Sequence, residues 1–98
     1  IKARDSYHVD ALITGGDFNP KIDLLALVGY SYSIKKQYLF LFKNFGSKKN
    51  QDFTFQKHDI PITTAQIEAI KIVNDKNFWL TSENEGGGYP KLIKLIFK

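Results

Sequence analysis

The chain has no cysteine and no methionine, and among its 98 residues there is a single arginine, Arg4, and a single tryptophan, Trp79. Without cysteine it forms no disulfide framework and no thiolate metal site. A nucleic-acid-binding surface usually carries several arginines, so we expect no nucleic-acid partner. No apolar run approaches the roughly 20 residues that a membrane-spanning helix needs, so we expect no transmembrane segment.

The chain begins with Ile1, which predicts a trimmed or excised product whose signal peptide has already been removed. Its length allows one domain, and 43% hydrophobic residues are enough for a packed core. The net charge of +4 comes from lysines that are dispersed along the chain. We interpret these lysines as charges that blunt sheet edges. A small basic domain that binds an anionic partner remains an alternative.

Short apolar segments rich in Ile and aromatic residues, separated by turn residues, predict an all-β fold with antiparallel strands. The apolar run at 24–28 indicates a strand that is buried on both faces. The seven predicted strands are 9–18, 23–32, 38–45, 53–62, 66–73, 78–82 and 91–97.

A weak internal repeat has a period of about 53 residues, which is typical of a propeller blade or a similar sheet unit. Residues 24–30 return at 77–83, residues 39–42 return at 92–95, and residues 13–17 return near 67–71. The repeat predicts one unit over 1–98, made of a four-stranded blade at 9–62 and an incomplete three-stranded blade at 63–98. Two blades cannot close a ring, so we expect a fragment of a larger propeller.

A helix over about 65–75 is the alternative for the start of the second unit. Thr63 and Gln66 fit a capping box, and Ile67, Ile70 and Val73 recur at helical spacing. The corresponding segment of the first unit contains Gly15 and Gly16, which are poor helix formers. The repeat therefore favours a strand here, and a helix would change the fold to α+β.

Several motifs together resemble the closing blades of a β-propeller-like repeat family of exported Bacteroidetes proteins, most of them uncharacterised. They are ITGGDFNP at 13–20, LALVGY at 25–30, QIEAI at 66–70, LTSE at 80–83 and PKLIKL at 90–95. The resemblance implies a C-terminal part of a propeller that is secreted, periplasmic or associated with the cell surface. It also implies further blades as partners, supplied by another chain or by the remainder of the same protein.

Three carboxylates and one aromatic residue are the candidate ligand-binding residues: Asp17, Glu68, Glu83 and Trp79. Asp17 and Glu68 lie at matched positions on the predicted innermost strands, where carboxylates can hold Ca²⁺ or act as general acid and base. A second interpretation is that they accept hydrogen bonds from backbone N–H groups and fix the register of adjacent blades. Trp79 either stacks on a ligand or belongs to the core.

The first functional hypothesis is a non-catalytic binding or scaffold module. The alternative is a calcium-dependent propeller hydrolase with an acidic channel, acting on phosphoesters or sugars. It relies on the likeness of the strands carrying Glu68 and Glu83 to phytase-like and esterase-like propellers. An isolated pair of blades should also leave apolar sheet faces without full cover, and these faces carry Leu25, Leu27, Phe40, Phe42, Trp79 and Leu80.

Overall fold

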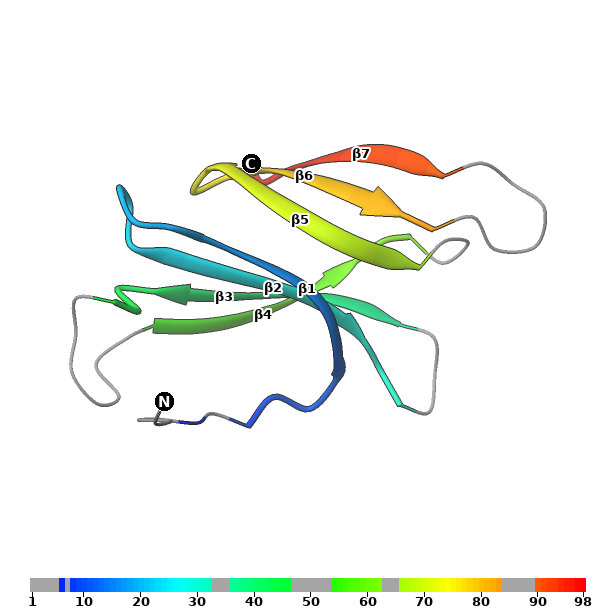
Figure 1. Ribbon diagram of the computed structural model, residues 1–98, viewed down its shortest axis with the longest axis horizontal. Coiled ribbons are helices and arrows are strands. Elements are labelled where there is room, and N and C mark those ends of the chain that lie inside the picture. Colours follow the sequence, from blue (N-terminus) through cyan, green and yellow to red (C-terminus); the bar gives the residue numbers. More distant parts are fainter. Residues whose placement is uncertain (1–5, 7, 33–35, 47–53, 63–65, 84–89) are drawn as a thin grey trace, which may run out of the picture.

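The computed structural model describes residues 6, 8–32, 36–46, 54–62, 66–83 and 90–98, and these form seven strands in two antiparallel sheets (Figure 1). The predicted all-β fold is confirmed. The first sheet consists of β1 (Leu12–Asn19), β2 (Leu24–Tyr30), β3 (Gln37–Lys43) and β4 (Thr54–Ile60). The second sheet consists of β5 (Ile67–Asn74), β6 (Asn77–Ser82) and β7 (Lys91–Ile96).

In both sheets, strands that follow one another in sequence lie side by side, in the orders β1-β2-β3-β4 and β5-β6-β7. Figure 1 shows β5, which begins the second sheet, lying across β1 and β2 of the first. The segment 67–74 is a strand, so the helical alternative is wrong where the structure describes it. Residues 63–65 of the proposed capping box lie outside the described residues.

The misleading helical spacing of the second unit has a physical cause in a β-bulge. The pairing of β5 with β6 shifts between Ile67 and Ala69, so Glu68 is an extra residue in the strand. An extra residue moves the next inward-facing side chain from position i+2 to position i+3. Ile67 and Ile70 are therefore both buried, three residues apart, in a strand.

The main core lies between the two sheets, where inward-facing residues of β2, β3, β5 and β6 are buried. The first sheet contributes Leu24, Ala26, Val28, Leu39, Leu41 and Ile60. The second sheet contributes Ile67, Ile70, Ile72, Phe78 and Leu80, with Ile93, Leu95 and Phe97 packed against them. Burial of each large apolar side chain is worth roughly 1.5–3 kcal/mol, so this layer is what holds the sheets together.

A second, smaller cluster covers the opposite face of the first sheet. Tyr38, Phe40 and Phe42 are buried there, together with Ala11 from the segment before β1. The residues that pack against them are Val9, Leu25, Leu27 and Phe45. β2 therefore has apolar neighbours on both faces, as its apolar run predicted. Phe40, Phe42 and Leu80 are buried within the chain, so the expectation that their faces lack cover is wrong for these residues.

The two sheets repeat the same local structures in the same order. β1 has a bulge at Thr14 and β5 has one at Glu68, and the four residue pairs that follow each bulge correspond in the two sheets. A second register shift of β5, between Ile72 and Asn74, has no counterpart in β1. The turn after β1 is closed by Lys21 N–H donating to Asn19 Oδ1, and the turn after β5 by Lys76 N–H donating to Asn74 Oδ1. The sequence repeat therefore corresponds to a structural repeat.

Candidate functional site at the junction of the two sheets

β5 is an edge strand of the second sheet, and its free edge meets side chains of the first. Such an edge presents backbone N–H and C=O groups that need partners when they are buried. β1 and β2 pack against β5, and three polar side chains of the first sheet supply these partners: Thr14, Asp17 and Gln37. We call these three side chains the junction residues.

Gln37 is the most buried of the junction residues and bridges the two sheets at the start of β3. Its Nε2 donates to the carbonyl oxygen of Ile62 at 2.9 Å, and its Oε1 accepts from the Ile67 N–H at 2.6 Å. One amide side chain thus satisfies a backbone acceptor and a backbone donor on either side of the connection between the sheets. Truncating it would leave two polar groups without these partners, which costs about 1–3 kcal/mol for each buried group.

Thr14 is placed by the bulge in β1. The bulge makes Thr14 the extra residue of its strand, and bulges re-aim side chains in this way. Its hydroxyl lies 2.6 Å from the carbonyl oxygen of Ile67, to which it donates, and 3.3 Å from that of Val28. Both backbone groups of Ile67 therefore bond to side chains of the first sheet.

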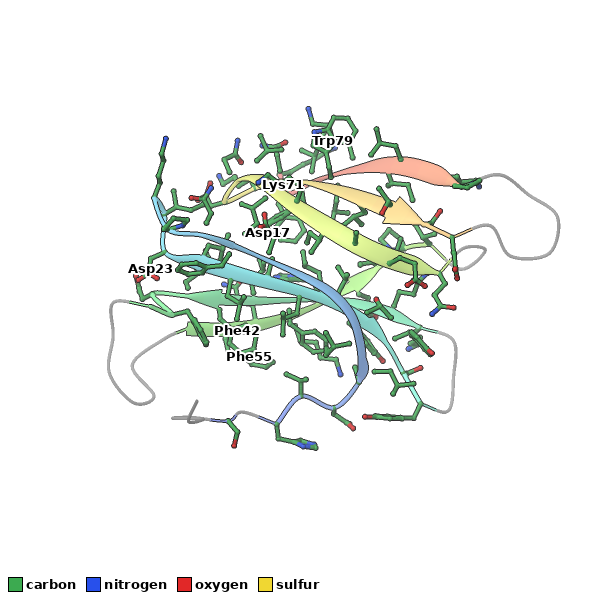
Figure 2. All side chains as sticks on the ribbon, viewed as in Figure 1. Asp17, Asp23, Phe42, Phe55, Lys71 and Trp79 are labelled. Carbon is green, nitrogen blue, oxygen red and sulfur yellow. The ribbon has the colours of Figure 1, made fainter. Side chains whose placement is uncertain are left out.

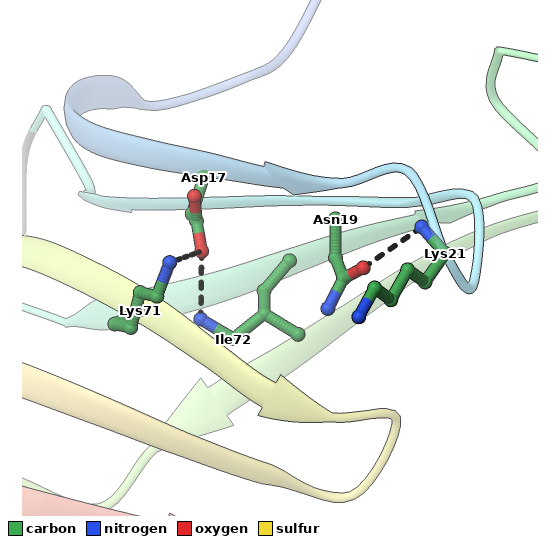
Figure 3. A network of polar contacts seen from close by, with 5 residues as sticks. All are labelled: Asp17, Asn19, Lys21, Lys71 and Ile72. Carbon is green, nitrogen blue, oxygen red and sulfur yellow. Dashed lines mark hydrogen bonds and ion pairs between the residues drawn. The ribbon is translucent and has the colours of Figure 1, made fainter.

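Asp17 connects β1 to the far end of β5, as Figure 3 shows. Its Oδ2 accepts a hydrogen bond from the Ile72 N–H at 2.8 Å and lies 3.9 Å from the Lys71 Nζ. The Lys71 side chain is 75% exposed, so the ion pair is screened by water and contributes little. The charged acceptor makes the hydrogen bond to Ile72 the stronger contact. Asp17 thus fixes the register between the sheets, as the second interpretation predicted.

Gly15 allows β1 and β5 to approach this closely. A Cβ atom on Gly15 would lie 2.7 Å from the carbonyl oxygen of Glu68 and 3.0 Å from the Cα of Ala69. Both are backbone atoms that cannot move aside. The glycine therefore serves the contact between β1 and β5 on which the three junction residues depend.

The four predicted ligand-binding residues are not gathered in one place. Asp17 and Glu68 lie on neighbouring strands, and Glu68 is partly buried. Glu83 is exposed beyond the end of β6, where its N–H donates to the Gln66 carbonyl oxygen at 2.9 Å. Trp79 lies on the side of the second sheet that faces away from the first (Figure 2). The structure thus places Asp17 and Glu68 on strands of different sheets that pack together, Asp17 beside Ile72 and Glu68 beside Gly15, and it places Trp79 on the other face of the second sheet.

Among the described residues, no three His, Cys, Asp or Glu side chains are grouped so that they could hold a metal ion. Every buried side-chain nitrogen or oxygen of the described residues has a hydrogen-bond partner. The junction is therefore satisfied from within the protein, and binding of Ca²⁺ by Asp17 and Glu68 stays a prediction.

Sequence reasoning missed two of the three junction residues. Gln37 stands at the start of an otherwise apolar strand, and a buried polar side chain in such a place needs a partner. Thr14 precedes two glycines, which mark a bulge or a close backbone approach. Both signals were present in the sequence, but neither identifies the backbone groups of Ile67, 30 and 53 residues away, that Gln37 and Thr14 bond.

No protein-family model, curated protein or solved structure matches the chain. The described residues also contain no helix of the length and hydropathy needed to cross a membrane.

Proposed function

We propose that the chain is a non-catalytic binding or scaffold module of an exported, cell-surface-associated β-propeller-like protein of the Bacteroidetes type. The observation that carries this proposal is the set of contacts that the Asp17 carboxylate makes. The best-placed candidate acid accepts a backbone hydrogen bond from the neighbouring sheet and pairs with Lys71, so it holds the sheets in register. No specific observation favours the calcium-dependent hydrolase.

A propeller-like arrangement is supported by the way in which one sheet follows the next. Four residues on the outer face of the first sheet correspond, by the repeat, to residues with which the second sheet packs on the first. These pairs are Leu25 with Phe78, Leu27 with Leu80, Phe40 with Ile93, and Phe42 with Leu95. The outer face of the first sheet thus carries the pattern with which a sheet packs onto a preceding sheet.

One cross-strand row on this face is only partly covered. Phe18, Leu25, Phe42 and Phe55 lie opposite one another on β1 to β4, and both end residues are exposed. Phe42 and Phe55 are seen in Figure 2 on the side of the molecule opposite to Trp79. A further blade, from another chain or the remainder of the same protein, is the partner we propose for this row.

Analytical ultracentrifugation of the 98-residue chain over a range of concentrations tests the proposal. We expect concentration-dependent association, because exposed apolar side chains in a row, such as Phe18 and Phe55, favour burial against a partner. Phe55→Ser should weaken the association, whereas the control Tyr32→Ser, at another exposed aromatic residue, should leave it unchanged. A compact monomer of about 11 kDa with a cooperative melt, unaffected by Phe55→Ser, would contradict the proposal.

A further inference from the structure

The outer face of the second sheet combines exposed apolar side chains with lysines. It consists of the residues of β5, β6 and β7 that alternate with the core: Ala69, Lys71, Asn74, Asn77, Trp79, Thr81, Leu92, Lys94 and Ile96. Three of its side chains are large, apolar and exposed, Trp79 by 37%, Leu92 by 66% and Ile96 by 56%. The two charged side chains are both lysines.

The corresponding face of the first sheet is built differently. The repeat relates Leu24 to Asn77, Ala26 to Trp79, Val28 to Thr81 and Leu41 to Lys94. The first-sheet residues are buried under the second sheet. A further sheet stacked in the same way on the second sheet would bury a lysine and would meet an indole where the first sheet has a methyl group. Isolated buried charges and overpacking are both unfavourable, so this face is not built for the same contact.

Lysine and tryptophan are placed together at the centre of this face. Lys71, Trp79 and Lys94 lie opposite one another on three neighbouring strands. The Lys94 Nζ is 5.6 Å from the centre of the Trp79 ring, a cation–π distance. Lys71 also reaches Asp17 at the edge of the sheet, which leaves Lys94 as the charge over the tryptophan. Leu92 and Ile96 lie on either side of Lys94 along β7.

We propose that the outer face of the second sheet binds the surface of an anionic lipid bilayer. Leu92 and Ile96 enter the boundary between headgroups and acyl chains, and Trp79 lies at the depth of the headgroups, where amphipathic aromatic rings are favoured. Lys94 keeps its ammonium group at the lipid phosphates while its methylene stem covers apolar surface. This binding is independent of the further blade proposed for the first sheet.

A bilayer fits these side chains better than a folded partner does. A lipid surface deforms around a protruding indole and needs no matching cavity, whereas a protein partner must bury Lys94 against a carboxylate of suitable position. Exposed aliphatic side chains together with lysines are the combination by which peripheral proteins hold to anionic membranes. An acidic polysaccharide would satisfy the lysines but would leave Leu92 and Ile96 in water.

Trp79 is the only tryptophan, so its fluorescence reports on this face alone. The full chain is mixed with vesicles of phosphatidylcholine containing 30% phosphatidylglycerol, and separately with pure phosphatidylcholine vesicles. We expect a blue shift of the Trp79 emission and co-sedimentation with the anionic vesicles, both much weaker at high salt and with the neutral vesicles. Heparin in place of the vesicles should bind weakly and produce no blue shift.

Variants on the two faces decide whether this surface is responsible. Leu92→Ser with Ile96→Ser should lower partitioning at least about tenfold, and Lys94→Gln about fivefold. Tyr32→Ser and Lys57→Gln, which remove similar groups elsewhere, should leave partitioning unchanged. Circular dichroism checks that each variant is folded. If the double variant unfolds, Lys94→Glu replaces it as the variant that tests this face. The proposal would be overturned if anionic vesicles produce no blue shift, or if the control variants lose as much partitioning as the face variants. It would also be overturned if the blue shift arises from self-association of the protein and not from the vesicles.

Discussion

The two sheets follow one plan of strands, turns and bulges but differ in their outer faces. The first sheet is apolar on both faces, and its outer face carries Phe40 and Phe42. The second sheet is apolar on the face that meets the first, and its outer face mixes Trp79 and Leu92 with lysines. Since the backbones are alike, the pattern of alternate residues decides which faces are buried and which meet a different environment.

The sharpest way to break this comparison is to exchange the residues at one repeat position. Leu41 is buried between the sheets, and its counterpart Lys94 is exposed. Leu41→Lys should abolish the cooperative unfolding transition, because an unpaired buried charge costs several kcal/mol, a large part of a typical stability of about 5–15 kcal/mol. Lys94→Leu should change the free energy of unfolding by no more than about 0.5 kcal/mol. Urea titrations followed by circular dichroism measure both variants.

Two adjacent residues of β6 sharpen the comparison within the second sheet. Phe78 is fully buried against the first sheet, whereas Trp79 lies on the outer face. Phe78→Ala should lower the free energy of unfolding by about 3–5 kcal/mol through loss of burial and the cavity left behind. Trp79→Ala should lower it by no more than about 1 kcal/mol. Urea titrations that give similar losses for the two variants would show that the outer face is part of the core.

The junction between the sheets depends on Gln37. Gln37→Leu removes the partners of the Ile67 N–H and the Ile62 carbonyl, and we expect a loss of about 2–4 kcal/mol from one buried and one partly buried backbone group. Gln56→Leu is the matched control, because Gln56 lies on β4 and contacts His58 there. Its loss should stay below about 1 kcal/mol. Thermal unfolding of the two variants under identical conditions tests this difference, and equal losses would contradict a role for Gln37 in joining the sheets.

The smallest expected effect is at Thr14. Thr14→Val keeps the shape of the side chain but removes the hydroxyl that donates to the Ile67 carbonyl, so we expect a loss of about 1 kcal/mol. Thr81→Val, at an exposed position of the second sheet, should lie within about 0.5 kcal/mol of the unchanged protein. Chemical denaturation resolves this difference, and a Thr14→Val variant as stable as the Thr81→Val control would show that the hydroxyl contributes nothing.

Much of the fold could be predicted from the sequence because strand signals are local. The apolar run of β2 and the turn residues Asn19 and Asn74 lie close to the structures they determine. The burial of Phe78 and the exposure of Trp79 follow from simple alternation once the strand is known. The helical spacing of Ile67 and Ile70 was misleading because a bulge changes the period of a strand.

The junction was harder to predict because its contacts join distant parts of the chain. Asp17 was identified as important, and its register-fixing role was one of two interpretations that the residues alone left open. The contact that supports the register-fixing role is with the Ile72 N–H, which lies 55 residues away in the sequence. Gln37 was missed because its partners belong to another sheet. Period and composition describe a strand's neighbours along the chain and do not describe what lies across from it.

The side-chain acceptors on β5 have a consequence for how the protein opens in solution. The N–H groups of Ile67 and Ile72 bond to Gln37 and Asp17 of the other sheet, whereas most strand amides bond within their own sheet. If the sheets part without losing their strands, these two amides become exchangeable while the amides shared between β5 and β6 stay protected. Faster deuterium uptake at Ile67 and Ile72 than along the β5–β6 ladder would therefore measure separation of the two sheets apart from global unfolding.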